Sequence, residues 1–305
     1  MTKKQAKNAD DYIERLNMNR LRGRMLRLSP PRGKKSREIL VVYGHHSNLE
    51  MTFPLAVELN KYGSVTVPDM PGFGGMQSFY RLGDRPTIDN LADYLAAFIK
   101  LFYKRRRLTI IGLSFGFVVV TRMLQKYPEL AKRVDLLISI GGYSRYDDFK
   151  MTTRNKAFKR TVASIFSKRI PAAVVQKVFL RPVFIKSSYK LLAKAEQGKS
   201  YSGTEQLEDH IAQAVQLWHM NDLRTYMNTS RAILSLDICK DRVSLPVHHL
   251  VSREKRFKNN TVEQHLNVIY ESVQVLETLN PKKKSTPAKS SQLPASLQRL
   301  LRNNV

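Results

Sequence analysis

Short apolar runs alternate with longer amphipathic stretches along the first half of the chain. Four runs are bounded by glycine, proline or charged residues, at 39–43, 64–67, 108–111 and 134–140. A short apolar run between turn residues is typical of a strand that is buried on both faces of a sheet. We therefore expect four buried strands in this half of the chain.

The stretches between these runs have the spacing of amphipathic helices. Apolar residues recur every three or four positions over 51–60, 88–103 and 117–126, which is the period of one helix face. Strands that alternate with helices predict a mostly parallel sheet with helices on both faces. The predicted fold class is therefore α/β, with any site at the carboxyl ends of the strands.

The alternation stops near residue 146 and returns near residue 243. In between, the pattern predicts helices over 154–170, 172–179, 184–195, 203–220 and 222–233. Strands over 246–251 and 272–276 follow, with a helix over 262–270 between them. A block of helices inserted into an α/β sheet is typical of a cap or lid.

These changes in pattern divide the chain into four expected parts. They are a basic N-terminal extension (1–36), a sheet core (37–145 and 243–279), a helical cap (146–242) and a basic C-terminal tail (280–305). The tail is expected to finish in a short helix from Pro294. The only tryptophan, Trp218, lies in the cap, where we expect it to anchor the cap against the core.

Residues 111–116 read Ile-Gly-Leu-Ser-Phe-Gly, directly after a predicted strand and before a predicted helix. The pattern G-x-S-x-G in this setting is typical of a nucleophile elbow, a turn so tight that glycines must flank the serine. Such a turn lifts the serine hydroxyl out of the sheet edge, above the positive end of a helix. Ser114 is therefore the candidate nucleophile.

With this motif the sequence resembles the α/β-hydrolase superfamily, in particular its serine esterases and lipases. Two further motifs agree: 43–45 reads Tyr-Gly-His where many members have His-Gly-x, and 69–74 matches the family's D-x-P-G-x-G turn. The resemblance implies that the backbone N–H groups of His45 and Phe115 form the oxyanion hole. It also implies that Asp69 braces its loop and does not react.

The resemblance further implies a chemistry. A serine hydroxyl becomes nucleophilic when a base removes its proton, and two N–H donors stabilise the oxyanion that follows. The expected substrate is a small carboxylic ester or a lipid-like acyl compound, with no metal and no organic cofactor.

The acid and the histidine of the family's triad are not in their usual places. The acid position falls in 252–257, where Lys255 stands for the usual aspartate and Glu254 is one residue away. The histidine position falls at Asn280, and an asparagine cannot take up and return a proton at neutral pH. The sequence therefore predicts an incomplete triad.

Other residues could replace the missing groups. His46 lies in the loop expected beside Ser114, so it is the candidate base, and Glu254 is the candidate acid. Asp147 and Asp148, which follow the fourth predicted strand, are alternative acids.

The remaining histidines are interpreted as structural. His248 and His249 are consecutive in a strand and point to opposite faces, so at least one is expected in the core. His219 is expected to pack within the cap, and His265 to lie on the solvent side of its helix.

The charge balance adds a second theme. The chain of 305 residues has 52 lysines and arginines against 25 acidic residues, a formal net charge of +27. Such a charge attracts anionic lipid, nucleic acid or polyphosphate without identifying which. The sequence has no zinc-ligand spacing, RRM signature or basic zipper, which makes a nucleic-acid reader a poor fit.

Three sequence features limit the class of protein further. Cys239 is the only cysteine, which excludes an intrachain disulfide framework. No apolar run reaches the length of a membrane span, and the N-terminus has no apolar signal region. A cytoplasmic location is therefore expected.

The cap is the most basic part of the chain. Between Lys150 and Lys199 there are thirteen lysines and arginines against one glutamate, a net charge of +12, with apolar residues interleaved. A basic amphipathic stretch of this kind is able to lie on an acidic membrane surface. The alternative is a lid whose apolar face covers a pocket and whose basic face is solvated.

Two functions remain open from the sequence. The first is a serine hydrolase that acts on a carboxylic ester or lipid-like acyl substrate through Ser114. The alternative is a catalytically degenerate member of the fold that binds a hydrophobic ligand or an anionic surface without turnover.

Overall fold

The computed structural model describes residues 8–30, 37–195, 204–251, 257–276 and 293–303. In this part of the chain the strands form one eight-stranded sheet in the order β1-β2-β4-β3-β5-β6-β7-β8. The strands are β1 (Ile13–Met18), β2 (Leu21–Leu28), β3 (Arg37–Val42), β4 (Gly63–Pro68), β5 (Leu108–Leu113), β6 (Val134–Ile140), β7 (Val243–Leu250) and β8 (Tyr270–Leu276). The six strands from β3 to β8 run parallel, and β1 and β2 are antiparallel.

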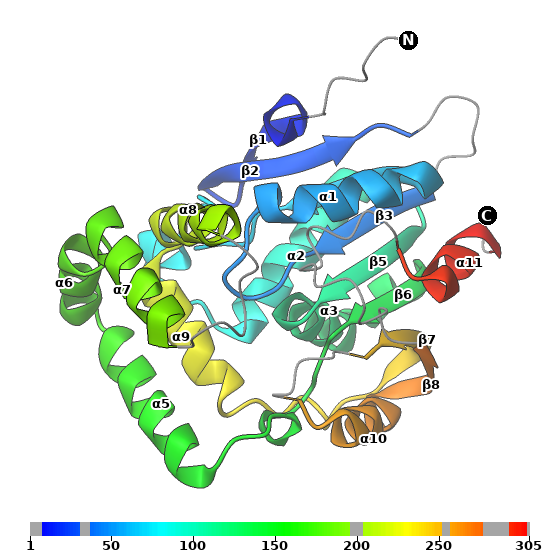
Figure 1. The fold of residues 1–305 in the computed structure, drawn as a ribbon. Coiled ribbons are helices and arrows are strands. Elements are labelled where there is room, and N and C mark those ends of the chain that lie inside the picture. The colour runs from blue at the N-terminus through cyan, green and yellow to red at the C-terminus, as the bar shows by residue number, and fades with distance from the viewer. Residues whose placement is uncertain (1–7, 31–36, 196–203, 252–256, 277–292, 304–305) are drawn as a thin grey trace.

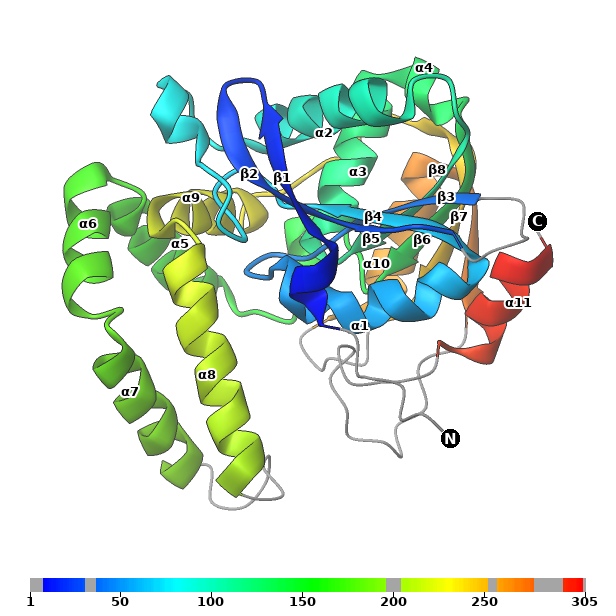
Figure 2. The ribbon, with the colours of Figure 1, turned by 90° about the horizontal axis from the view of Figure 1, so that it is seen from above.

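Helices cover both faces of this sheet. The helices of the core are α1 (Leu49–Leu59), α2 (Ile88–Tyr103), α3 (Phe115–Lys126), α4 (Pro128–Ala131), α10 (Asn259–Ile269) and α11 (Ala295–Asn303). In Figure 2 the sheet is seen nearly edge-on, with α1 and α11 on one face and α2 and α3 on the other. The predicted α/β class, with a mostly parallel sheet, is confirmed.

The central strands are buried because they are apolar on both faces. Residues 39–42 of β3 and 110–111 of β5 are completely buried between the two helix layers. A strand with helices on both sides needs no polar face, so its sequence is a continuous apolar run. This is why the parallel strands could be located from the sequence to within a few residues.

The N-terminal hairpin differs from the sequence interpretation. The sequence predicts a basic extension over 1–36, but residues 13–28 of it form β1 and β2 at the edge of the sheet. Asn19 and Arg20 join the two strands and both have positive φ, 51° and 63°, as a type I′ hairpin turn requires. The sequence hid the hairpin because its outward positions are mostly charged and its turn lacks a glycine.

A helical insertion separates β6 from β7. Its helices are α5 (Thr153–Phe166), α6 (Arg169–Val178), α7 (Pro182–Ala195), α8 (Thr204–Met220) and α9 (Leu223–Ile233), after a 3₁₀ turn at Tyr146–Asp148. The insertion lies to one side of the core, with α6 and α7 farthest from the sheet (Figures 1 and 2). In the described part of the chain, no helix is long and apolar enough to span a bilayer.

The insertion is attached to the turn that follows β4. The N–H of Gly75 donates to Met220 O (2.9 Å), and the N–H of Asp222 donates to Gly72 O (2.9 Å). These bonds join the end of α8 and the start of α9 to the carboxyl edge of the sheet. The edge that carries the predicted site is thus the edge that faces the insertion.

Candidate functional site

Ser114 occupies a sharp turn between β5 and α3. Its backbone has φ 49° and ψ −116°, a conformation that side chains other than glycine rarely adopt. Its N–H donates to Ile140 O (2.9 Å), which ties the turn to the neighbouring strand β6. The residue is half-buried and stands at the N-terminus of α3. This is the geometry that the sequence motif predicts.

The two glycines of the motif are required by close backbone approach. A Cβ atom at Gly116 would overlap the carbonyl oxygens of Val42 and Tyr43. A Cβ atom at Gly112 would lie 2.6 Å from Phe117 Cα. At both positions the added Cβ atom would overlap main-chain atoms, which cannot move aside as the end of a flexible side chain can.

The loop between β3 and α1 lies directly beside Ser114. A Cβ atom at Gly44 would be only 3.3 Å from Ser114 Cβ, so the main chain of this loop passes close to the serine. Phe115 is the first residue of α3, and the first N–H groups of a helix have no acceptor within the helix. The oxyanion hole expected from the His45 and Phe115 N–H groups stays a prediction; Phe115 follows Ser114 directly, and His45 follows Gly44 in the neighbouring loop.

Asp69 braces the turn after β4. Its buried carboxylate accepts a hydrogen bond from the Tyr43 hydroxyl (2.8 Å) and forms an ion pair with Arg24 (3.2 Å). A Cβ atom at Gly74 would overlap the carboxylate. Arg24 also pairs with Glu50 of α1 (2.6 Å). These contacts hold the turn against β2, β3 and α1, and both oxygens of the Asp69 carboxylate have partners in the scaffold.

His45 lies among aromatic rings that come from three parts of the chain. Its ring stacks on Tyr226 of α9 (centroids 4.5 Å apart) and meets the edges of Phe115 (5.3 Å) and Phe73 (5.5 Å). Its Nε2 atom lies 2.8 Å from the Thr229 hydroxyl oxygen. The side chain of His45 therefore fastens the loop to the insertion.

His46, the candidate base, is bound to the insertion through Asn221. The amide oxygen of Asn221 accepts from the Gly74 N–H (2.8 Å), so its amide nitrogen faces His46 Nδ1 (3.0 Å) and donates to it. Nδ1 is then the acceptor, and the proton of the neutral ring lies on Nε2. Burial lowers the pKa of His46 to about 4. Trp218 packs on the ring with centroids 4.2 Å apart, as expected for an anchor between cap and core.

The other histidines have structural partners or lie elsewhere. His248 and His249 are both buried in β7, and His249 Nδ1 lies 2.9 Å from the Ser139 hydroxyl. His219 is exposed on α8, so the expectation that it packs within the cap is wrong. All seven histidines belong to the described residues, and none of them forms a hydrogen bond with the Ser114 hydroxyl there. Glu254, the candidate acid, lies outside the described residues.

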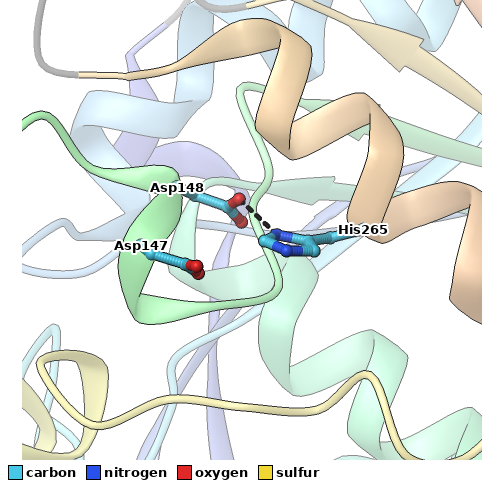
Figure 3. Close-up of side chains that lie close together, drawn as sticks. All are labelled: Asp147, Asp148 and His265. Carbon is cyan, nitrogen blue, oxygen red and sulfur yellow. Dashed lines mark hydrogen bonds and ion pairs between the residues drawn. The ribbon is translucent and has the colours of Figure 1, made fainter.

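An acid–imidazole pair that the sequence did not reveal lies behind the loop after β6. His265 Nδ1 of α10 is 2.7 Å from Asp148 Oδ1 (Figure 3). Asp148 Oδ2 accepts hydrogen bonds from the N–H groups of Ser144 (2.9 Å) and Arg145 (3.0 Å). The expectation that His265 faces solvent is wrong, because its side chain is only 14% exposed. The two residues are far apart in sequence, so only the tertiary structure joins them.

The same loop offers the closest approach to a metal site in the described part of the chain. Asp147, Asp148 and His265 have potential ligand atoms within 4.8 Å of one another. Asp147 already faces Arg145 (3.6 Å), and Asp148 already holds His265. We therefore assign the pair a structural role, in which it fastens α10 to the loop after β6, and assign no metal to it.

Comparisons with known proteins agree with the fold. The enol-lactonase from Burkholderia xenovorans LB400 is 14% identical, over 95% of this chain and 99% of that one, with a TM-score of 0.62. Cfl2 from Burkholderia cenocepacia is 15% identical, over 95% and 94% of the two chains, with a TM-score of 0.66. A hydrolase from Pseudomonas aeruginosa PA01 is 13% identical, over 87% and 89%, with a TM-score of 0.57.

No protein-family profile and no curated protein matches the sequence. At the identities found, likeness to solved structures concerns the fold. The chain has the α/β-hydrolase fold, and the resemblance drawn from the three sequence motifs is confirmed at this level.

Proposed function

We propose that this chain is a serine hydrolase that accepts a carboxylic ester or lipid-like acyl substrate and is acylated at Ser114. The observation that carries the proposal is the backbone of Ser114 at φ 49° and ψ −116°. Backbone strain of this kind costs free energy and persists where the surrounding structure enforces it, most often at functional sites. An ordinary strand-to-helix turn would not need it.

The surroundings of Ser114 support an acyl substrate. The loop beside the serine is packed against the rings of Phe73, Phe115 and Tyr226. Aromatic rings near the serine would suit the hydrocarbon part of an ester, while the N–H groups at the elbow would suit its carbonyl oxygen. The likeness to an enol-lactonase agrees with ester chemistry, because a lactone is a cyclic ester.

We expect the proposed reaction to be slow, because among the described residues no imidazole forms a hydrogen bond with the Ser114 hydroxyl and could take its proton directly. His46 accepts the Asn221 amide at Nδ1, and the pKa of His46 near 4 leaves it a weak base. Loss of the base from a serine triad typically costs several orders of magnitude in rate. Acylation by an activated ester, whose leaving group needs no protonation, is the step expected to survive.

The second candidate function is binding without turnover. It is favoured by the contacts of the two histidines in the loop beside Ser114. The His45 side chain contacts the Thr229 hydroxyl and the His46 side chain accepts from the Asn221 amide, so both imidazoles have partners other than the serine. In this case the elbow would hold a carbonyl or hydrophobic ligand and leave its bonds intact.

Reaction with p-nitrophenyl esters of increasing chain length separates these functions. The hydrolase proposal expects a burst of p-nitrophenolate, at most one per chain, followed by slow turnover, and expects both to disappear in Ser114→Ala. Arg105→Gln, on the exposed loop before β5, is the matched control and keeps the burst. A folded protein that releases product at the rate of Ser114→Ala would refute acylation and leave binding as the function.

A further inference from the structure

The outermost helices of the insertion expose apolar side chains in an ordered arrangement. On α6, Ile170, Val174 and Val178 follow one another at intervals of four residues, which places them on one face of the helix. All three are exposed, and Ile170 is 76% exposed. The buried residue of α6 is Ala172, so the larger apolar residues of this helix point outward.

The next helix continues this surface. Val183 and Leu191 of α7 are each 70% exposed, while Ile185 of the same helix is buried. The rings of Phe179 and Phe184 lie 6.3 Å apart and join the end of α6 to the start of α7. The α6–α7 surface is defined by Ile170, Val174, Val178, Phe179, Val183, Phe184 and Leu191.

Basic side chains surround the α6–α7 surface. Six exposed cations lie on or beside the two helices: Lys168, Arg169, Lys177, Arg181, Lys186 and Lys190. Neither helix contains an aspartate or glutamate. Among the described residues none of these six side chains belongs to an ion pair with a carboxylate. The surface therefore exposes apolar side chains, and every charged residue on its own two helices is a cation.

We propose that the α6–α7 surface docks on an anionic lipid bilayer. Apolar side chains of an amphipathic helix enter the boundary between headgroups and acyl chains, and flanking cations bind the acidic headgroups. The figures place α6 and α7 on the outside of the molecule (Figures 1 and 2). Nothing else in the described fold covers them, so a bilayer could approach them directly.

Two other partners fit these observations less well. Five of the seven side chains of the surface are aliphatic, and aliphatic side chains do not stack on nucleic-acid bases as aromatic rings do. A second copy of the chain, bound through the same surface, would bring two clusters of like charge together, which costs free energy. A bilayer with acidic headgroups satisfies both the charge and the aliphatic character.

Flotation of the full-length protein with vesicles tests the charge requirement. The vesicles are phosphatidylcholine alone, or phosphatidylcholine with about 30% phosphatidylserine. The protein should float with the acidic vesicles and remain at the bottom with the neutral ones. Replacing Lys177, Arg181, Lys186 and Lys190 by glutamine should reduce partitioning by about fivefold per charge, so more than a hundredfold in all.

The matched control removes the same charge from elsewhere. Arg105 and Lys132 are exposed on the core, and Lys240 and Arg242 are exposed on the segment that leads into β7. Their replacement by glutamine should leave partitioning within about threefold of the parent protein. Equal losses in the two fourfold variants would overturn the proposal, because the overall charge of the chain, and not this surface, would then be the cause.

A second pair of variants tests the apolar contacts. Glutamine at Ile170, Val178, Val183 and Leu191 should abolish flotation, while glutamine at the exposed core residues Leu82, Leu101, Val268 and Val275 should not. Circular dichroism checks that each variant is folded. If the variant with glutamine at the four surface positions still floats, the surface is not a bilayer-docking surface. The same conclusion follows if that variant floats as the parent protein does but no longer binds a short single-stranded RNA. Because no ester is used, this result is independent of acylation at Ser114.

Discussion

Replacing Ser114 by glycine should make the fold more stable, because it removes strain from the elbow. A residue other than glycine at a φ of 49° and ψ of −116° costs about 1–3 kcal/mol. Glycine avoids this cost but gives the unfolded chain more freedom, which offsets about 0.5–1 kcal/mol. We expect a net gain of about 1 kcal/mol in the free energy of unfolding.

The reference for this measurement is Ser114→Ala and not the parent protein. Alanine keeps the Cβ atom, and therefore the strain, but lacks the hydroxyl, so the comparison isolates the backbone term. Urea unfolding of the two variants gives the difference directly. A glycine variant equal to or less stable than the alanine variant would show that the elbow stores no strain, and the main support for a functional Ser114 would be lost.

Three further predictions concern the scaffold of the site. Gly116→Ala should lower the free energy of unfolding by more than about 3 kcal/mol, since its Cβ meets two carbonyl oxygens. Gly83→Ala, with a φ of 86° and open space around it, should cost only about 1 kcal/mol in the same urea assay. Burial lowers the pKa values of His46 and His249 to about 4, below the ordinary value of 6.5. As the pH falls below about 6.5, these histidines are therefore protonated in the unfolded chain but remain neutral in the folded chain. Between about pH 7.5 and 5 the free energy of unfolding should fall by about 2 kcal/mol for each, and His46→Gln should remove its share of that slope. Asp148→Ala should lower the free energy of unfolding by about 2–4 kcal/mol, because it leaves two N–H groups and an imidazole without their acceptor. Thermal unfolding measures this difference, and a loss under about 1 kcal/mol would show that the Asp148–His265 pair is unimportant for stability.

The sequence located what is determined locally. The parallel strands are continuous apolar runs because both of their faces are buried, and the elbow follows from the glycines at 112 and 116. The edge hairpin at 13–28 was not predicted, because its two strands have one solvated face and carry charged residues at most of their exposed positions. With so few apolar residues, the alternation of apolar and polar positions does not distinguish such a strand from a basic extension.

The polar partners in the site could not have been found from the sequence. The pairs His46–Asn221 and Asp148–His265 join residues 175 and 117 positions apart. The orientation of the Asn221 amide, which sets the tautomer of His46, depends on the Gly74 N–H on a third segment. Such contacts arise only when the turn after β4, the insertion and the core are packed together.

The central claim is that Ser114 is a nucleophile, and reaction with a fluorophosphonate tests it most directly. Intact-mass analysis of the folded protein should show one adduct per chain, and peptide mapping should place it on the segment that contains Ser114. The adduct should be absent from Ser114→Ala. A folded protein that stays unmodified, or an adduct that maps to another residue and persists in the alanine variant, would contradict the account.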